Sequence, residues 1–308
     1  MTGNRPLPSL KYPTYGAVIS KELGGPRDIP RSVAITKGAA APTGFLGLEY
    51  GPLETGATPK AGQPMNIRGL SLSNGLTLAD IDRRDSLVKR YDTAFGSFAR
   101  EDKVLSRMDE FSQKAYEMMR SGRTREAFDL TREPAAISGL FGDGNFSQSC
   151  LLSTRLIEAG VRLLSIQFGG WDTHRDNFNC LKDNNLPNLD DGLAGLFRAL
   201  DSKGLLNSTA VFVTGEFGRT PKINQRSGRD HYPCAIFCLL AGGGMQGGQV
   251  VGASDAKGEG PRDRVISPDD VAATFYHALG VDHTKEYYTA TGRPVMIVRH
   301  GKLIPELV

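Results

Sequence analysis

The residues after 144 alternate between short apolar runs and longer amphipathic patterns, and this alternation constrains the fold more than any other feature of the sequence. Uninterrupted apolar runs predict strands that are buried on both faces, and the intervening patterns predict the helices that cover them. A chain of this kind folds as α/β, with a parallel or mostly parallel sheet between helices. We expect strands at 161–168, 210–214, 235–240 and 294–298, and helices at 147–159, 189–203 and 269–279.

The first half of the chain is organised differently. A short helix is expected over residues 14–23 and a β-branched strand over 32–36. Residues 38–69 are dense in glycine and proline and predict a loop that wraps over the scaffold. Residues 78–130 are charged, rich in methionine and spaced for helices, so we expect a helical insertion or cap within one domain that spans 1–308.

Composition excludes two classes of function. Lys and Arg number 37 against 34 Asp and Glu, with no basic run, so nucleic acid is not expected as a partner. No apolar stretch approaches the roughly 18 residues of a membrane span. The four cysteines include no Cys-x-x-Cys pair and do not form a disulfide framework. The classes of function that remain are an enzyme and a binding protein, acting on a small molecule or a polymer.

The loop after the expected strand 161–168 carries the first candidate ligands. Ligands of such sheets bind beyond the carboxyl ends of the strands, so loops at these ends are where chemistry is expected. This loop reads GGWDTHRDN, and its Asp172 and His174 offer the carboxylate oxygen and imidazole nitrogen that divalent metals take. The alternative is an aspartate that caps a helix and a histidine on the surface.

Two further loops carry candidate residues. Glu216 follows the expected strand 210–214, where a carboxylate is costly to bury unless it is paired or binds metal. Arg219 in the same loop could hold an anionic group, and the alternative is a structural ion pair between Glu216 and Arg219. His231 precedes the expected strand 235–240, so a neighbouring loop must bring it to the site; the alternative is a histidine that caps a turn.

Several runs are long enough to be specific: GGWDTHRDNF, TGEFGRTPKIN, GRDHYP, SPDDVAATFYHALG, GFLGLEYGP and SQSCLLSTRLIEAGVR. In these runs the sequence resembles a large, uncharacterised bacterial family of exported, sulfatase-like proteins of unknown function, in the alkaline phosphatase-like superfamily. The resemblance covers nearly the whole chain. It implies a three-layer α/β/α sandwich and a metal-dependent hydrolase of phosphate or sulfate esters.

The resemblance also implies roles for particular residues. Asp172 and His174 are similar to the superfamily's Asp and His pair, and His231 to its later His ligand. Glu216 stands in place of an Asp, and Phe217 stands where a His would be. A divalent ion (zinc, manganese or calcium) is therefore expected on the four ligands, and an anionic group beside three polar side chains. The expected ligands are Asp172, His174, Glu216 and His231, and the expected anion contacts are Arg219, Asn177 and Asp230.

Two departures from the family pattern limit what the resemblance implies. Phe217 cannot bind metal, so a single metal or a degenerate site is expected unless Asp230 or another residue substitutes. Residues 1–5 (MTGNR) look like a run that follows the superfamily's first strand and its nucleophile. The nucleophile, one metal ligand and an export signal are then expected ahead of Met1, and the domain is expected to be incomplete at its N-terminus.

Two hypotheses of function remain open. The first is a hydrolase of a small anionic ester, or of a sulfated or phosphorylated polymer, in which Asp172, His174, Glu216 and His231 hold the metal. The second is a non-catalytic, exported binding protein with a degenerate metal site, which Phe217 favours. No signal peptide lies within residues 1–308, and the resemblance implies a periplasmic or exported complete protein.

Overall fold

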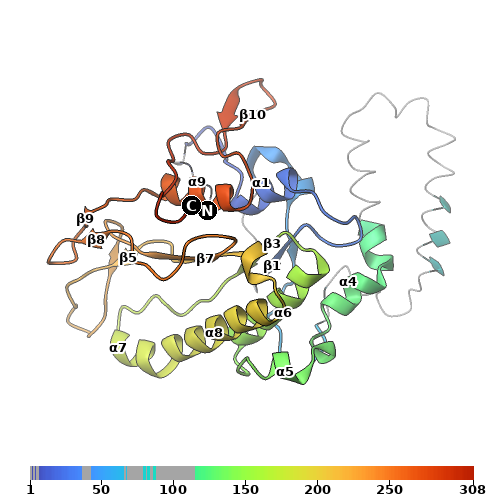
Figure 1. Cartoon of the computed structure of the whole chain (residues 1–308), viewed down its shortest axis with the longest axis horizontal. Helices are drawn as coiled ribbons and strands as arrows, with labels where there is room; N and C mark the ends of the chain where they lie inside the picture. The colour runs from blue at the N-terminus through green and yellow to red at the C-terminus, as the bar shows by residue number, and fades with distance from the viewer. Residues whose placement is uncertain are drawn as a thin grey trace.

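The computed structural model describes residues 2, 4, 7–36, 43–65, 67, 79–80, 82–83, 86–87 and 115–308. These residues form a mixed α/β fold (Figure 1). The α-helices are α1 (Tyr15–Glu22), α4 (Gly122–Ala127), α5 (Ala135–Ser138), α6 (Asn145–Ala159), α7 (Asn177–Cys180), α8 (Leu186–Ser202) and α9 (Pro268–Ala278). Short 3-10 turns are η1 (Gly44–Leu46), η2 (Leu48–Tyr50), η3 (Leu130–Arg132) and η5 (Leu206–Ser208), and η4 (Leu181–Asn185) is a π-turn.

The strands form one three-stranded sheet and several two-stranded pairs. In the first sheet, β1 is the central strand and runs parallel to both neighbours, as the sequence predicted for this class. Every residue of β1 is buried. The strands are β1 (Ser32–Ile35), β2 (Leu53–Glu54), β3 (Leu163–Ile166), β4 (Ala210–Thr214), β5 (Gly218–Arg219), β6 (His231–Tyr232), β7 (Cys238–Gly242), β8 (Ala253–Ser254), β9 (Pro261–Asp263), β10 (Glu286–Tyr288) and β11 (Pro294–Met296).

The pairing of β4 with β7 is antiparallel, and this differs from the mostly parallel sheet that the sequence predicted. The reason is the connection. A parallel pair needs a crossover of a dozen or so residues that is usually a helix, and residues 215–237 form only loops and the small β5–β6 pair. The chain therefore returns directly alongside β4. The expected strand 294–298 likewise pairs only with β10, again antiparallel.

Local signals explain where the main helices begin and end. Gly160 has φ 102° and ends α6 in the left-handed conformation that suits glycine. Ser267 and Asp270 form a reciprocal capping box at the start of α9, with Pro268 in the first turn. Helix α8 begins before the expected residue 189 because the π-turn η4 leads into it.

Helices cover both sides of the strands. In Figure 1, α1 and α9 lie above the strands, and α6 and α8 lie below them. The core accordingly has two buried clusters. One joins α6 and α8 to β1 and includes Val33, Ile35, Leu152, Leu156 and Leu200. The other joins α1 to α9 and includes Val18, Ile19, Phe275 and Tyr276.

The region before α6 was predicted less completely. The expected loop 38–69 contains β2 and two 3-10 turns in its described part. Most of the expected helical segment 78–130 lies outside the described residues; within it, 115–120 are helical and α4 follows. All four cysteines are free. Among the described residues, none of the helices combines the length and the apolar character that a membrane crossing requires.

Candidate metal centre

Three of the predicted ligands meet at one point. Asp172 and His174 lie in the loop after β3, and His231 lies in β6. The Oδ1 atom of Asp172 is 3.1 Å from Nε2 of His174 and 2.8 Å from Nε2 of His231. The two imidazole Nε2 atoms are 3.2 Å apart. This group could hold a metal ion, because each residue presents one ligand atom toward the others.

Backbone hydrogen bonds join the two loops that carry these residues. The amide of Asp176 donates to the carbonyl of Arg226 at 3.0 Å, and the amide of Arg229 donates to the carbonyl of Thr173 at 3.1 Å. The contact leaves no room for a side chain at Gly228, where a Cβ would lie 2.1 Å from the backbone carbonyl of His174. A glycine is therefore required where the loops cross.

The β5–β6 pair places Arg219 beside His231. The two residues face each other across the pair, and Gly218 faces Tyr232. A Cβ on Gly218 would lie 1.7 Å from the carbonyl oxygen of Ala235, so only glycine fits at this turn of the chain. Residues opposite each other in an antiparallel pair project to the same face, and both side chains accordingly reach Asp172.

Arg219 links the two acidic residues of the site. Its Nη1 donates to Oδ1 of Asp172 at 2.6 Å, and its Nη2 donates to Oε1 of Glu216 at 3.2 Å. Glu216 is not part of the group that could hold a metal, and its observed contact is the ion pair that the sequence left open as an alternative. The hydrogen bonds from His231 and from Arg219 lower the pKa of Asp172 to about 2, so this exposed carboxylate is ionised.

Asp230 lies behind His174 rather than among the three clustered ligand atoms. Its Oδ1 accepts a hydrogen bond from Nδ1 of His174 at 2.7 Å. This bond, and a second one from Asn224, lowers the pKa of Asp230. A proton fixed on Nδ1 leaves the lone pair of Nε2 directed at Asp172 and His231. The carboxylate thereby sets the tautomer that metal binding requires.

Asn224 is a functional residue that the sequence analysis missed. Its Nδ2 donates to the carbonyl of His174 at 3.1 Å and to Asp230 at 3.2 Å. Its Oδ1 accepts from the amides of Arg226 and Gly228, each at 2.9 Å. The only signal was its place in the run TGEFGRTPKIN. One side chain thus ties together its own loop, the backbone of His174 and the carboxylate of Asp230.

Two other predicted residues occupy positions away from the ligand atoms. Asn177 is 3% exposed, and its Oδ1 accepts from the hydroxyl of Thr173 at 2.5 Å. Its contact with an anion stays a prediction. Phe217 packs with its ring centroid 4.5 Å from that of His231, and the guanidinium of Arg219 lies over the same ring at 5.4 Å. The aromatic ring thus supports the histidine as an apolar neighbour.

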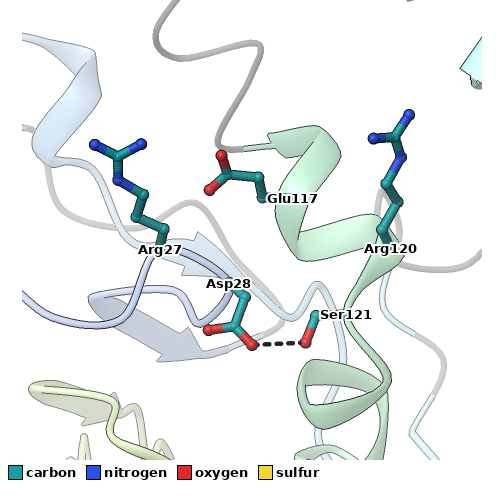
Figure 2. Close-up of a pocket in the computed structure, with 5 residues that line it drawn as sticks. All are labelled: Arg27, Asp28, Glu117, Arg120 and Ser121. Carbon is teal, nitrogen blue, oxygen red and sulfur yellow. Dashed lines mark hydrogen bonds between the residues drawn. The ribbon is translucent and has the colours of Figure 1, made fainter.

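A shallow pocket of about 400 Å³ lies elsewhere, between the segment before β1 and the start of α4 (Figure 2). Asp28 accepts a hydrogen bond there from Ser121 at 2.9 Å, as Figure 2 shows. Arg27, Glu117 and Arg120 complete its lining, so both signs of charge are present. Its residues do not gather into a set of ligand atoms, and its hydrogen bond joins the start of α4 to the segment before β1.

The protein is therefore an α/β protein with an exposed cluster of two histidines and one aspartate. A second carboxylate, Asp230, orients the imidazole of His174. The chain belongs to the family described as Protein of unknown function (DUF1501), whose model matches residues 1–308. Neither a curated protein nor a solved structure matches the chain.

Proposed function

We propose that this protein is a metal-dependent hydrolase of phosphate or sulfate esters with an alkaline phosphatase-like α/β/α sandwich. One observation carries the proposal: Asp172 Oδ1, His174 Nε2 and His231 Nε2 lie within 3.2 Å of one another at an open surface. Three converging donors with an accessible side are typical of catalytic rather than structural metal sites, which are closed by protein ligands.

The donor set favours zinc or manganese over calcium. Two imidazole nitrogens and one carboxylate suit zinc and other transition metals. Calcium takes about six to eight oxygen ligands, and only Asp172 offers an oxygen within the group. The carboxylate of Asp230 behind His174 matches the arrangement that orients a ligating imidazole.

A divalent ion bound there would polarise an ester oxygen and stabilise developing negative charge. The side chains around it have separate tasks. Arg219 is positively charged and forks between Asp172 and Glu216, from where it can turn toward an anionic group. Asp172 is 63% exposed and His231 is 49% exposed, so the site admits a small ester or a segment of a sulfated or phosphorylated polymer.

The competing function is a non-catalytic binding protein with the same metal site. The specific observation in its favour is Phe217, which contacts His231 where a further ligand was expected. Under both proposals the complete protein is exported.

Metal content and turnover test the proposal together. The chain is purified without chelator, supplied with zinc or manganese, and its bound metal is counted by elemental analysis. Hydrolysis of an aryl phosphate and an aryl sulfate is measured on the same samples. The variant Asp172→Ala/His174→Ala is compared with Asp282→Ala/His283→Ala, a matched pair of the same residue types outside the cluster.

We expect one metal per chain, lost in the first variant and kept in the control. Turnover that disappears with the metal supports the hydrolase. A full complement of metal without turnover of either ester supports the binding protein instead. Absence of stoichiometric metal from the unmodified chain contradicts both proposals.

A further inference from the structure

Asp172, Glu216 and Phe217 together hold the guanidinium group of Arg219. Its Nη1 lies 2.6 Å from Asp172 Oδ1, its Nη2 lies 3.2 Å from Glu216 Oε1, and its central carbon lies 5.4 Å from the centre of the Phe217 ring. The Arg219 side chain is 18% exposed, although both carboxylates are more than half exposed. The guanidinium is therefore confined beside the candidate metal centre and does not extend into solvent.

The contact with Asp172 involves the atom that a metal ion would take. Oδ1 of Asp172 accepts the hydrogen bond from Arg219, and the same oxygen lies against Nε2 of His174 and Nε2 of His231. These three residues form the group that could hold a metal. A guanidinium and a divalent ion on one carboxylate oxygen repel each other, because both are positively charged. Arg219 therefore competes with a metal ion for Asp172.

The other two contacts remain available when Asp172 is taken. Glu216 lies outside the group that could hold a metal, and the face of the Phe217 ring attracts a cation without binding metal. The guanidinium carries five N–H donors in a planar fork, so the donor released from Asp172 can bond another acceptor. Arg219 and His231 face each other across the β5–β6 pair and project to the same face of it. The released donor thus stays beside the ligand atoms.

We propose that Arg219 exchanges Asp172 for a tetrahedral oxyanion when a divalent cation binds. In the metal-free site its guanidinium neutralises Asp172. Once the cation holds Asp172, the guanidinium turns to the sulfate or phosphate group of a ligand, while Glu216 and Phe217 keep it in place. This inference rests on the proposed function, and it adds the order in which the charges of that site are paired.

The consequence is a coupling between the two ligands. A cation must displace Arg219 from Asp172, and an oxyanion that captures Arg219 removes this competitor. Each ligand therefore strengthens the binding of the other, and by linkage the factor is the same in both directions. A site of this kind binds metal and anion more tightly together than either one alone.

The proposal differs in sign from a purely positioning role. An arginine that only oriented Asp172 would favour metal binding, and its removal would weaken the affinity for zinc. An arginine that competes for Asp172 opposes metal binding, and its removal strengthens that affinity. The direction of the change in zinc affinity thus distinguishes the two roles without any measurement of turnover.

Zinc affinity with and without inorganic sulfate tests the proposal. It is measured on the whole chain by competition with a chromogenic chelator, in chloride and in sulfate at equal ionic strength. We expect sulfate to tighten zinc binding about 10-fold in the unmodified chain. Arg219→Gln should bind zinc about 10-fold more tightly than the unmodified chain in chloride, and sulfate should no longer change its affinity.

Two further variants act as controls. Arg262→Gln removes the same charge from β9, outside the cluster, and should behave as the unmodified chain. Arg219→Lys keeps the positive charge but lacks the planar fork. Its zinc affinity in chloride should match that of the unmodified chain, and the effect of sulfate should shrink. Circular dichroism establishes that each variant is folded, and Arg219→Lys decides the test if Arg219→Gln does not fold.

The possible failures are distinguishable. An unmodified chain that binds no zinc contradicts the proposed function, and this inference falls with it. Zinc that binds to the unmodified chain but more weakly to Arg219→Gln assigns Arg219 a positioning role and overturns the inference alone. The inference is also overturned if zinc affinity does not respond to Arg219→Gln, or if the full effect of sulfate persists in either Arg219 variant.

Discussion

The molecule contains two clusters of charged residues that are built in opposite ways. In the first, the Glu133 carboxylate is 1% exposed and lies 2.5 Å from Arg155 Nη1 and 2.9 Å from Lys203 Nζ. In the second, Asp172 is 63% exposed and receives His174, His231 and Arg219 on a single oxygen. The first cluster joins η3, α6 and the end of α8, and the second joins loops at the ends of strands.

The two clusters differ in the kind of partner that each carboxylate has, and this difference distinguishes an ion-pair network from a set of possible ligands. Around Glu133 the two partners are permanent cations, and each bond neutralises charge inside the protein. Around Asp172 two of the three partners are imidazoles whose Nε2 atoms also face each other. Two imidazole nitrogens this close to each other and to an ionised carboxylate form a set of ligand atoms that could hold a cation. The open cluster could therefore hold a metal ion, whereas the closed cluster neutralises buried charge between packed elements.

Removing the buried carboxylate should have the largest effect. Glu133→Gln removes the buried carboxylate that Arg155 and Lys203 share and leaves Lys203 with only the exposed Glu158, and we expect the free energy of unfolding to fall by about 3 kcal/mol. Denaturant unfolding checks this. The control is Glu158→Gln, which also removes a partner of Lys203 but at 54% exposure, and it should cost less than about 1 kcal/mol. Equal losses would show that burial does not distinguish the two carboxylates.

The second largest effect is expected from a side chain added at Gly228, where the two loops of the site cross. Gly228→Ala places a Cβ 2.1 Å from the His174 carbonyl, and the loops must separate, at a cost of about 1–3 kcal/mol. Zinc binding should weaken in the same variant because His174 moves. Gly247→Ala is the matched control, since a Cβ there meets no atom within 4 Å. A Gly228→Ala protein with unchanged stability and zinc affinity would contradict the tight crossing.

The carboxylate behind His174 should affect metal affinity without being a ligand. Asp230→Asn weakens the bond that holds the Nδ1 proton, and we expect zinc affinity to fall roughly 10- to 100-fold, as for other carboxylates behind ligating imidazoles. Competition with a chromogenic chelator measures the affinity. Asp176→Asn lies in the loop that carries His174, and its side chain is bonded to Asn179, so this control should leave zinc affinity unchanged. A complete loss of zinc would instead make Asp230 a ligand.

The sequence predicts one of these clusters far better than the other. Asp172, His174 and His231 are recognisable because ligand-type residues follow apolar strands, and the structure brings all three together. Glu133, Arg155 and Lys203 carry no such signal, since each reads as an ordinary polar residue of a helix or turn. Asn224 and the orienting role of Asp230 were likewise hidden, because both depend on how two loops cross about 50 residues apart.

The same limit applies to the fold. Helix ends were predictable at Gly160 and Ser267, where one residue decides the local backbone. The direction of β7 was not, because an apolar run reads the same in parallel and antiparallel pairs. The sequence between β4 and β7 shows no helical pattern, and this could have indicated the antiparallel pairing, because a parallel pair needs a crossover that is usually a helix.

The smallest effect on stability is expected from the titration of Asp172. It bears most directly on the comparison of the two clusters, because it tests which hydrogen bonds keep the Asp172 carboxylate ionised. The pKa of Asp172 is lowered from 3.8 to about 2, first by the hydrogen bond from His231 and then by the one from Arg219. A lowered folded-state pKa means that this carboxylate stabilises the protein above about pH 3.8 and that the contribution is lost as the pH falls toward 2. The effect on stability is small because the group is exposed.

Carboxyl-carbon NMR of the metal-free protein measures this pKa directly. His231→Ala should move the Asp172 midpoint up toward 3.8, and Arg219→Gln should move it less. The Asp282 carboxylate, whose pKa is lowered by Thr284, serves as the control in the same spectra and should not shift. An Asp172 midpoint that stays near 2 in both variants would mean that neither hydrogen bond holds the charge. The open cluster would then not be the assembly of donors around one oxygen that distinguishes it from the closed cluster at Glu133.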